Sequence, residues 1–284
     1  MCKKTNYPKT IGVIISTYNS PVWLEKVLWG YESQSYKDFE IIIADDGSSE
    51  ETRQLIHFFQ QNTNLKIKHV WQEDKGFRKN RILNSAILAA ESEYLIFTDQ
   101  DCIPRQDFIE THARYARKGH FLSAGYLKLP LSISRALTKE DILNQSAFDL
   151  KWLRKKGLEY NFKCTKLLKN KTYSKILNFA TTAKATWNGC NSSGWKTDFL
   201  AINGFNEMME YGGEDREFGE RLFNNDIKSR QIRYSAVCVH LDHQRPYKTD
   251  EIMRKNKAIR KQIRKERQIE TPNGIRKIDK RISY

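Results

Sequence analysis

The sequence lacks long apolar runs and an apolar leader at its start. Its longest apolar stretches, residues 11–15 and 41–44, fall far short of the ~20 residues that a membrane-spanning helix needs. Residues 1–9 are polar, and the apolar stretch that follows them is too short for a secretory signal. We therefore expect a globular, cytoplasmic protein rather than an integral membrane or exported protein.

Paired cysteines and the common phosphate-binding motifs are also missing. The five cysteines are odd in number, scattered and without a CxxC pair, which favours ordinary reduced thiols over a disulfide or zinc framework. Neither GxxxxGK(S/T) nor GxGxxG occurs, so a P-loop or a dinucleotide-binding site loses its main support.

Positive charge is abundant but unevenly placed. The 284 residues hold 49 Lys and Arg against 34 Asp and Glu, a net charge of +15, and 39% are hydrophobic, which excludes disorder over the whole chain. Residues 251–284 alone carry +8, from twelve basic and four acidic residues. Their helical pattern places Ile252, Ile259 and Ile263 on a narrow apolar stripe. This segment is predicted to be either a solvated, partly disordered tail or a helix attracted to an anionic membrane surface.

Short β-branched runs alternate with longer amphipathic segments in the first half of the chain. Strands separated by helices of this length imply right-handed crossovers and a parallel sheet. We expect an α/β fold with a mixed, mainly parallel sheet and helices on both faces. The pattern weakens over 127–186, where only helical insertions at 138–157 and 160–169 are predicted. The other predicted elements are strands at 11–16, 40–44, 65–71, 93–98 and 234–240, and helices at 21–34, 50–61, 77–90 and 214–225.

Polar side chains follow three of these strands, at the sheet edge where α/β proteins bind ligands. Residues 17–19 follow the first strand, Asp45 and Asp46 the second, and Asp99 and Asp101 the fourth. Carboxylates two residues apart on an extended segment share a face and offer hard oxygen ligands to a divalent cation, which can neutralise a diphosphate. The pattern predicts a nucleotide diphosphate site, although each residue alone also suits a turn or a helix cap.

Ordered motifs between residues 10 and 245 resemble family 2 glycosyltransferases. The GT-A fold of that family is a Rossmann-like fold for nucleotide-diphospho-sugar transferases. The motifs of its nucleotide-sugar half are IGVIISTYN at 11–19, IIIADDGSS at 41–49 and FTDQD at 97–101. Members with a galactosyltransferase-like C-terminal region are similar at QEDKGFR (72–78), NGFNE (203–207), YGGED (211–215) and VH (239–240).

The resemblance implies a division of the chain and roles for particular residues. Residues 1–126 would bind the nucleotide sugar, 127–250 would bind the acceptor and catalyse, and 251–284 would form the basic tail. Mn²⁺ or Mg²⁺ would be held by Asp99, Asp101 and His240, with His243 close enough to replace His240. Donor contacts would come from Thr17, Tyr18, Asn19, Asp45, Asp46, Phe77, Lys79, Arg81 and Asp99. The general base would be Asp215, and the acceptor would meet Glu214, Tyr211 and Trp195.

Several of these residues could instead have a purely structural role. Glu214 and Asp215 also suit the start of a helix, where acidic side chains favour the helix dipole. His240 could be a buried, hydrogen-bonded histidine. Trp187 and Trp195 could stack on sugar faces or pack in the core.

The expected function is inverting, metal-dependent transfer of a hexose or N-acetylhexosamine. The donor would be a UDP-sugar, and the acceptor a glycan or lipid-linked hydroxyl in bacterial surface polysaccharide or lipopolysaccharide synthesis. The enzyme would be peripheral at the inner face of the plasma membrane, through residues 251–284. A catalytically inactive glycan-binding module is one alternative. A basic nucleic-acid-binding protein is another, but no recognised module is visible, so we expect no nucleic-acid partner.

Overall fold

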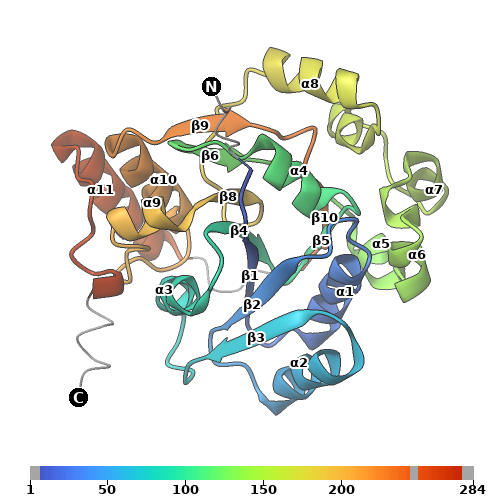
Figure 1. Ribbon diagram of the computed structural model, residues 1–284, viewed down its shortest axis with the longest axis horizontal. Helices are drawn as coiled ribbons and strands as arrows, with labels where there is room; N and C mark the ends of the chain where they lie inside the picture. The colour runs from blue at the N-terminus through green and yellow to red at the C-terminus, as the bar shows by residue number, and fades with distance from the viewer. Residues whose placement is uncertain (1–6, 244–248, 277–284) are drawn as a thin grey trace.

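Figure 1 shows the computed structural model, which describes residues 7–243 and 249–276. The larger of two sheets has the strand order β3-β2-β1-β4-β8-β6-β9. The first four of these strands are parallel, β8 is antiparallel to β4 and β6, and β9 is parallel to β6. The predicted mixed, mainly parallel sheet is therefore confirmed. Its strands are β1 (Ile11–Thr17), β2 (Phe39–Asp45), β3 (Lys66–Trp71), β4 (Tyr94–Asp99), β6 (His120–Ser123), β8 (Ser192–Trp195) and β9 (Lys228–Gln231).

A small second sheet brings a distant histidine to the end of β4. It has the order β5 (Cys102–Pro104), β10 (Val237–His240), β7 (Gly125–Lys128). β5 begins three residues after the end of β4, and the antiparallel register of β10 pairs His240 with Cys102. The strand predicted at 234–240 is shorter than expected, because its first three residues form a turn and a bend.

Side chains of β1 alternate between two core layers, because successive residues of a strand point to opposite faces. Val13 and Ile15 pack in one apolar cluster with α1 and α2, whereas Ile14 packs in another with α3 and α10. Figure 1 shows α1 and α3 on opposite sides of the sheet, which confirms the prediction of helices on both faces. The helices around the sheets are α1 (Pro21–Glu32), α2 (Glu50–Asn62), α3 (Lys79–Ala89), α4 (Phe108–Tyr115), α9 (Lys196–Ala201) and α10 (Glu214–Asn224).

Residues 127–186 form a series of short helices beside the small sheet. The helical insertion predicted at 138–157 is present but broken into α6, a 3₁₀ turn and α7, and the one predicted at 160–169 is a 3₁₀ helix. Thr138 and Asp141 form a capping box that starts α6, and Asp149 caps α7. The helices of this region are α5 (Leu131–Ala136), α6 (Lys139–Leu143), η1 (Ser146–Phe148), α7 (Leu150–Lys155), η2 (Phe162–Leu167) and α8 (Lys171–Ala180).

The basic C-terminal segment forms helix α11 (Asp250–Glu266), which packs against α10. The predicted helix is confirmed, but its apolar stripe is turned inward, with Ile263 only 3% exposed. Beyond the helix, Ile275 is also buried and joins the core cluster that contains Ile14 of β1. The hypothesis of a solvated tail is therefore wrong for residues 249–276, while residues 277–284 lie outside the described part of the chain.

None of the helices in the described ranges combines the length and the apolar composition needed to cross a bilayer.

Candidate active site

A cavity of about 670 Å³ lies at the carboxyl ends of β1 and β4, beside the loop that precedes α10. Of the fifteen residues that the family resemblance gives a role, twelve line it, and so does His243, the alternative to His240. The twelve are Thr17, Tyr18, Asn19, Asp46, Phe77, Lys79, Asp99, Asp101, Tyr211, Glu214, Asp215 and His240. The cavity therefore lies where α/β proteins bind ligands, at the carboxyl ends of the parallel strands.

The turn after β2 holds Asp46 at the cavity wall. Gly47 has a φ of +96°, and a Cβ there would lie 2.5 Å from the backbone of Asp74, so this turn requires glycine. Asp46 accepts hydrogen bonds from the side-chain amide of Gln72 and from the backbone N–H of Arg78, the latter at 2.8 Å. Burial raises the pKa of Asp46. The two hydrogen bonds fix the carboxylate in one orientation.

Asp45 is not brought to the cavity, contrary to the prediction. It is buried, accepts the backbone N–H of Ser48 at 2.8 Å, and has its Oδ2 2.9 Å from Nε2 of His69. The last residue of β2 and the next residue point to different sides, so Asp45 stabilises the turn while Asp46 faces the cavity.

Lys79, at the start of α3, lies among carboxylates. Its Nζ is 2.7 Å from Oδ1 of Asp99, which also accepts a hydrogen bond from the Ser16 hydroxyl at 2.5 Å. Burial alone would lower the pKa of Lys79, but the negative charges of Asp99, Glu214 and Asp215 outweigh it and raise that pKa. Lys79 is therefore held as a cation in the cavity.

Two glycines turn the chain into α10 and present its first two carboxylates to the cavity. Gly212 and Gly213 have φ values of +107° and +92°, which favour glycine. Glu214 accepts the N–H of Gly212 at 2.7 Å, and Asp215 accepts the N–H of Gly189 at 3.2 Å. Burial raises the pKa of both carboxyl groups, and for Glu214 the negative charge of Asp215 adds to the rise in pKa. Raised pKa values of this kind suit proton acceptors.

Asp101 and two histidines form a compact group at the end of β10. Oδ2 of Asp101 lies 2.7 Å from Nε2 of His243 and 3.7 Å from Nε2 of His240. Burial alone would raise the pKa of Asp101, but the hydrogen bond from His243 and the charge of His240 hold that pKa below its usual value. The rings of the two histidines are nearly parallel, with centroids 5.9 Å apart.

These side chains fit a divalent cation. The ligand atoms of Asp101, Cys102 and His240 lie within 4.8 Å of one another. Nδ1 of His240 donates to the carbonyl of Leu241 at 2.7 Å, which leaves Nε2 as the nitrogen that a metal ion would bind in place of a proton, the usual arrangement of a metal-ligating histidine. Burial raises the pKa of Cys102, so this thiol stays protonated and is a poor ligand. Asp99 is not part of this group, because it faces Lys79.

Arg81 and Trp195, two further predicted contacts, do not line the cavity. The antiparallel register of β8 places Trp195 opposite Tyr94, at the far end of β4 from Asp99. Trp195 is buried, its ring centroid is 5.1 Å from that of Tyr94, and the Lys118 ammonium lies 3.2 Å from the centroid of a Trp195 ring. The prediction that Trp195 meets an acceptor is therefore wrong, and Trp195 belongs to the core.

Sequence reasoning does not single out some of the cavity residues. Gln100, between the two predicted metal carboxylates, accepts hydrogen bonds from the Thr17 hydroxyl at 2.5 Å and from the Tyr18 N–H at 2.8 Å. It thereby ties the end of β1 to the end of β4. Residues 188–190 also line the cavity, and their only sequence signal is an Asn-Gly pair next to Trp187. The four described cysteines are free, including Cys190 in this loop.

Two family models match successive parts of the sequence. Glycosyl transferase family 2 matches residues 12–176, and the N-terminal domain of galactosyltransferase matches residues 178–245. Validoxylamine A glucosyltransferase of Streptomyces hygroscopicus subsp. jinggangensis is 26% identical over 245 residues, which cover 81% of this chain and 55% of that protein. Chondroitin synthase of Escherichia coli is 24% identical over 81% of this chain and 34% of its own length. The chain thus spans about half or less of these relatives.

Solved structures show the same fold. The mannosyltransferase PcManGT from Pyrobaculum calidifontis, in complex with GDP-Man and Mn²⁺, has a TM-score of 0.57 at 17% identity, over 86% of this chain and 59% of its own. S. aureus TarS 1–349 in complex with UDP-GlcNAc has a TM-score of 0.58 at 16% identity, and the match covers 88% of this chain and 66% of the TarS chain. These neighbours confirm the GT-A fold. The first family model covers more than half of the sequence, and the chain belongs to glycosyl transferase family 2.

Proposed function

We propose that this protein is an inverting, metal-dependent glycosyltransferase that moves a hexose or N-acetylhexosamine from a UDP-sugar to an acceptor hydroxyl. The observation that carries the proposal is that Asp215 and the Asp101–His240 group line one cavity. A direct displacement needs a base for the acceptor hydroxyl and positive charge near the leaving diphosphate. The cavity contains side chains suited to both tasks.

The donor is proposed to lie against the ends of β1, β2 and β4. Thr17, Asp46 and Asp99 line that part of the cavity. The rings of Phe77 and Tyr211 meet edge to face with centroids 6.0 Å apart, and such an aromatic wall can pack against a base or a sugar ring. TarS 1–349 was solved with UDP-GlcNAc and with UDP, which supports a UDP-sugar here.

Asp215 is the proposed general base. It takes the proton from the acceptor hydroxyl, whose oxygen bonds to the anomeric carbon while the bond from that carbon to the diphosphate oxygen breaks. Attack from the side opposite the leaving group inverts the configuration, and no covalent enzyme intermediate is needed. Glu214, held by the N–H of Gly212, is placed to accept a hydrogen bond from a second acceptor hydroxyl.

Replacing Asp215 with Asn tests this assignment. Because a positioned base contributes roughly 10²–10⁴-fold, transfer should fall by about that factor while UDP binding, measured by calorimetry, is retained. Asp226→Asn is the matched control: this residue follows α10, has a φ of +57° that Asn tolerates, and does not line the cavity. Near-normal turnover of the Asp215 variant would refute the role.

Asp101 and His240 are the residues proposed to hold Mn²⁺ or Mg²⁺, with His243 as a neighbouring ligand. When bound, the cation supplies positive charge that stabilises the departing diphosphate. EDTA should abolish transfer, and added Mn²⁺ or Mg²⁺ should restore it. His240→Ala should also weaken Mn²⁺ binding measured by calorimetry without substrate. Undiminished activity in EDTA would contradict the site.

The acceptor is proposed to be a glycan or a lipid-linked sugar of a bacterial surface polysaccharide or lipopolysaccharide, bound near Glu214 and Tyr211. The sequence suggests contact with an anionic membrane surface through residues 251–284. In the structure Ile263 of α11 is buried, so this helix offers a bilayer chiefly its charged outer face. We therefore place membrane contact on a different surface, which lies beside α8.

A further inference from the structure

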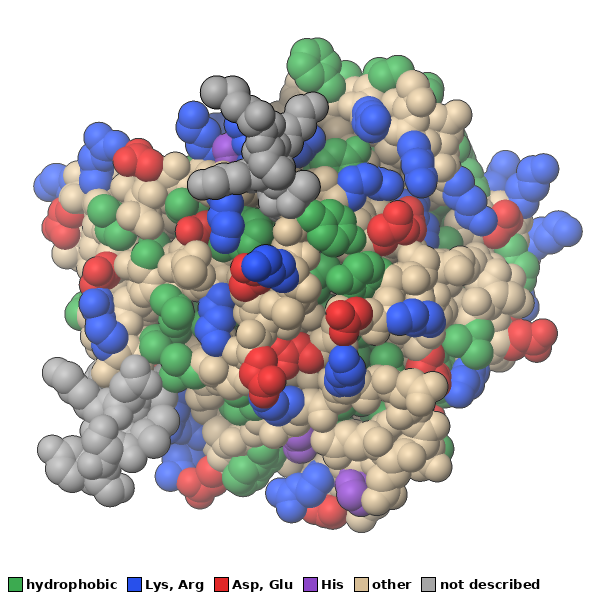
Figure 2. All heavy atoms as spheres, viewed as in Figure 1, with side chains coloured by type: hydrophobic (Ala, Val, Ile, Leu, Met, Phe, Trp, Pro, Cys, Tyr) green, Lys and Arg blue, Asp and Glu red, His purple; other side chains and the backbone are tan. Residues whose placement is uncertain are grey.

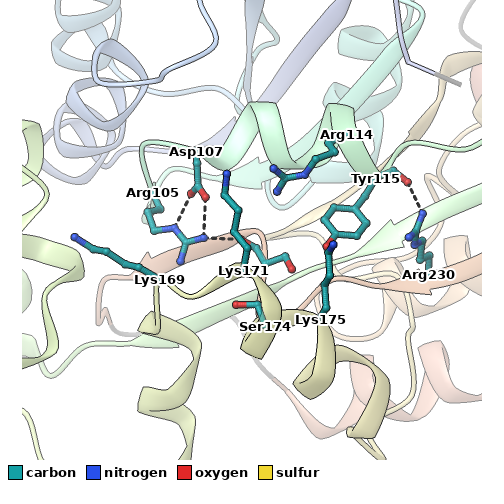
Figure 3. Close-up of a pocket in the computed structure, with 10 residues that line it drawn as sticks. Arg105, Asp107, Arg114, Tyr115, Lys169, Lys171, Ser174, Lys175 and Arg230 are labelled. Carbon is teal, nitrogen blue, oxygen red and sulfur yellow. Dashed lines mark hydrogen bonds and ion pairs between the residues drawn. The ribbon is translucent and has the colours of Figure 1, made fainter. Parts of the chain in front are cut away.

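A second cavity, of about 310 Å³, lies away from the active site and is strongly basic (Figure 3). α4, α8 and β9 contribute to its lining, together with the residues that follow β5. Figure 3 shows Lys171 and Lys175 extending from α8 toward α4. Among the described residues, Asp107 is the single acid in the lining. The basic residues that line the cavity are Arg105, Arg114, Lys169, Lys171, Lys175 and Arg230.

Arg105 lines this cavity, and one nitrogen of its guanidinium group, Nη1, makes no hydrogen bond within the described residues. The residue is 8% exposed, and its Nε and Nη2 contact the Asp107 carboxylate at 2.6 and 3.0 Å. Nη2 also donates to the carbonyl of Ser235 at 2.6 Å. Within the part of the chain that the structure describes, Nη1 is buried without a hydrogen-bond partner. A buried guanidinium N–H without an acceptor is costly, which makes Arg105 a favourable partner for an anion that reaches this part of the cavity wall.

The lysines around the cavity are not neutralised by neighbouring acids. Over residues 7–243 and 249–276, no ion pair joins Lys169, Lys171 or Lys175 to a carboxylate. Asp107 is already engaged by Arg105. The lining thus has a large excess of positive charge, which favours a phosphate group.

The outer face of α8 is apolar, which is unusual for a helix on a protein surface. Ser174 and Asn178 face the body, where Asn178 bonds to Ser235, whereas the opposite face carries exposed apolar side chains. Tyr173, Ile176 and Phe179 are 49%, 56% and 94% exposed. Figure 2 shows hydrophobic side chains over α8 at the top of the molecule, with Lys and Arg side chains below them. Exposed patches of this kind mark interaction sites.

We propose that the basic cavity and the apolar face of α8 together dock the protein on an anionic phospholipid bilayer. A headgroup phosphate would enter the cavity toward Nη1 of Arg105, while Phe179 and Ile176 would enter the interface between headgroups and acyl chains. Apolar residues beside Lys and Arg are the features that hold a peripheral helix on a membrane. A free anion would fill the cavity but leave Phe179 in water, and this favours the bilayer.

This surface is separate from the active site. Asp101 precedes the three residues of β5 and Arg105 follows them, so four extended steps of the chain, about 13 Å, separate the two residues. Membrane binding can therefore be measured separately from sugar transfer. If the protein does not bind membranes, the proposed transferase activity is not contradicted.

Vesicle binding by the full chain tests the proposal. The protein should sediment with vesicles of phosphatidylcholine and phosphatidylglycerol but not with phosphatidylcholine alone. Lys171→Glu/Lys175→Glu should weaken binding tenfold or more, since each basic residue near an anionic surface is worth roughly a fivefold factor. Ile176→Ser/Phe179→Ser should also weaken it. Both pairs are exposed, so the fold should tolerate these changes.

The matched control is Lys257→Glu/Lys261→Glu on α11, which makes the same charge change on exposed residues of a helix at the left of Figure 1, away from α8. It should bind vesicles within about twofold of wild type, because its charges lie far from the docking surface. An equal loss in this control, or no preference for phosphatidylglycerol, would overturn the proposal. Tight binding of inorganic phosphate, together with unchanged vesicle binding by Ile176→Ser/Phe179→Ser, would also overturn it and show a soluble-anion site.

Discussion

Lys79 sets the charge balance of the active site. It contacts Asp99 directly, and its positive charge lowers the pKa values of Glu214 and Asp215 against the opposing effect of burial. A base that is to accept a proton must be ionised first. Lys79 therefore helps to keep the proposed base in its active, charged form.

Lys79→Met should move the acidic limb of the pH–activity profile to higher pH. Without the neighbouring cation, the charged forms of Glu214 and Asp215 lose stabilisation, their pKa values rise, and Asp215 becomes protonated at a pH where it is normally charged. The measurement is kcat/KM as a function of pH. Lys75→Met, at an exposed lysine paired with Glu73, should leave the limb in place. An unmoved limb in the Lys79 variant would show that Asp215 does not control it.

Most residues assigned to the site from the sequence line the cavity, but a few do not, for physical reasons. The order of residues shows that a polar side chain follows a strand, but not the direction in which that side chain points. The sequence therefore gives no reason to distinguish Asp45 from Asp46. It also misplaces Trp195, because nothing in the sequence indicates that β8 runs antiparallel to β4. The predicted proximity of Asp101 and His240, in contrast, is confirmed by the small sheet.

At the scale of elements, α4 contains a buried neutral histidine. His112 is fully buried, with Nδ1 2.7 Å from the Ser193 hydroxyl and Nε2 3.0 Å from the side-chain carbonyl oxygen of Asn191. Burial lowers the pKa of His112 to about 4, although the hydrogen bond to Asn191 opposes this. His112 thereby links α4 to β8 and to the loop before it.

This histidine should make the fold lose stability between about pH 6.5 and pH 4. In that range the unfolded chain binds a proton at His112 and the folded protein does not, so lowering the pH favours unfolding by up to roughly 3 kcal/mol. Urea unfolding at about pH 7 and pH 4.5 measures the loss. His112→Gln should lose clearly less stability on acidification than wild type, whereas His57→Gln, at an exposed position, should behave as wild type. Equal pH slopes in all three proteins would contradict the explanation.

Regular elements are predicted better than short ones. β1, β2 and α2 have strong periodicity, and the sequence places their bounds within a residue or two of those in the structure. β5, with three residues, carries too little pattern to be recognised, and the broken helices of residues 127–186 are held by local caps. Tertiary contacts also fix the position of α11 against the rest of the protein. Its buried Asn256 donates hydrogen bonds to the carbonyls of Glu210 and Gly212, both at 3.0 Å.

At the scale of the whole molecule, the net charge of +15 is not divided between a folded body and a separate basic tail, as the sequence suggests. The basic C-terminal segment, as far as residue 276, is part of the folded body, where Arg260 pairs with Glu220 of α10 at 2.6 Å. The lysines of the second cavity lie instead on the side of the molecule that carries α8. If the proposed docking surface is right, these lysines orient the protein at a bilayer, whereas the positive charge of residues 251–276 belongs to the folded body.

Ile275→Ala should destabilise the entire fold. The side chain is 3% exposed in the core cluster that contains Ile14, so truncation should lower the free energy of unfolding by roughly 2–4 kcal/mol. Ile269→Ala is the matched control, because Ile269 is 37% exposed and its truncation should cost less than about 1 kcal/mol. Chemical denaturation measures both. Equal, small effects would show that the segment after α11 is not part of the core.

Ile275 and Ile14 belong to the same core cluster, and this has a consequence for how the protein folds during synthesis. β1 leaves the ribosome long before Ile275, because most of the sequence lies between them. That cluster lacks one of its buried members until then, and contacts between such distant residues slow folding. Nascent chains that stall before Ile275 should consequently bind chaperones, with the carboxylates of the proposed catalytic site already synthesised but not yet held in place.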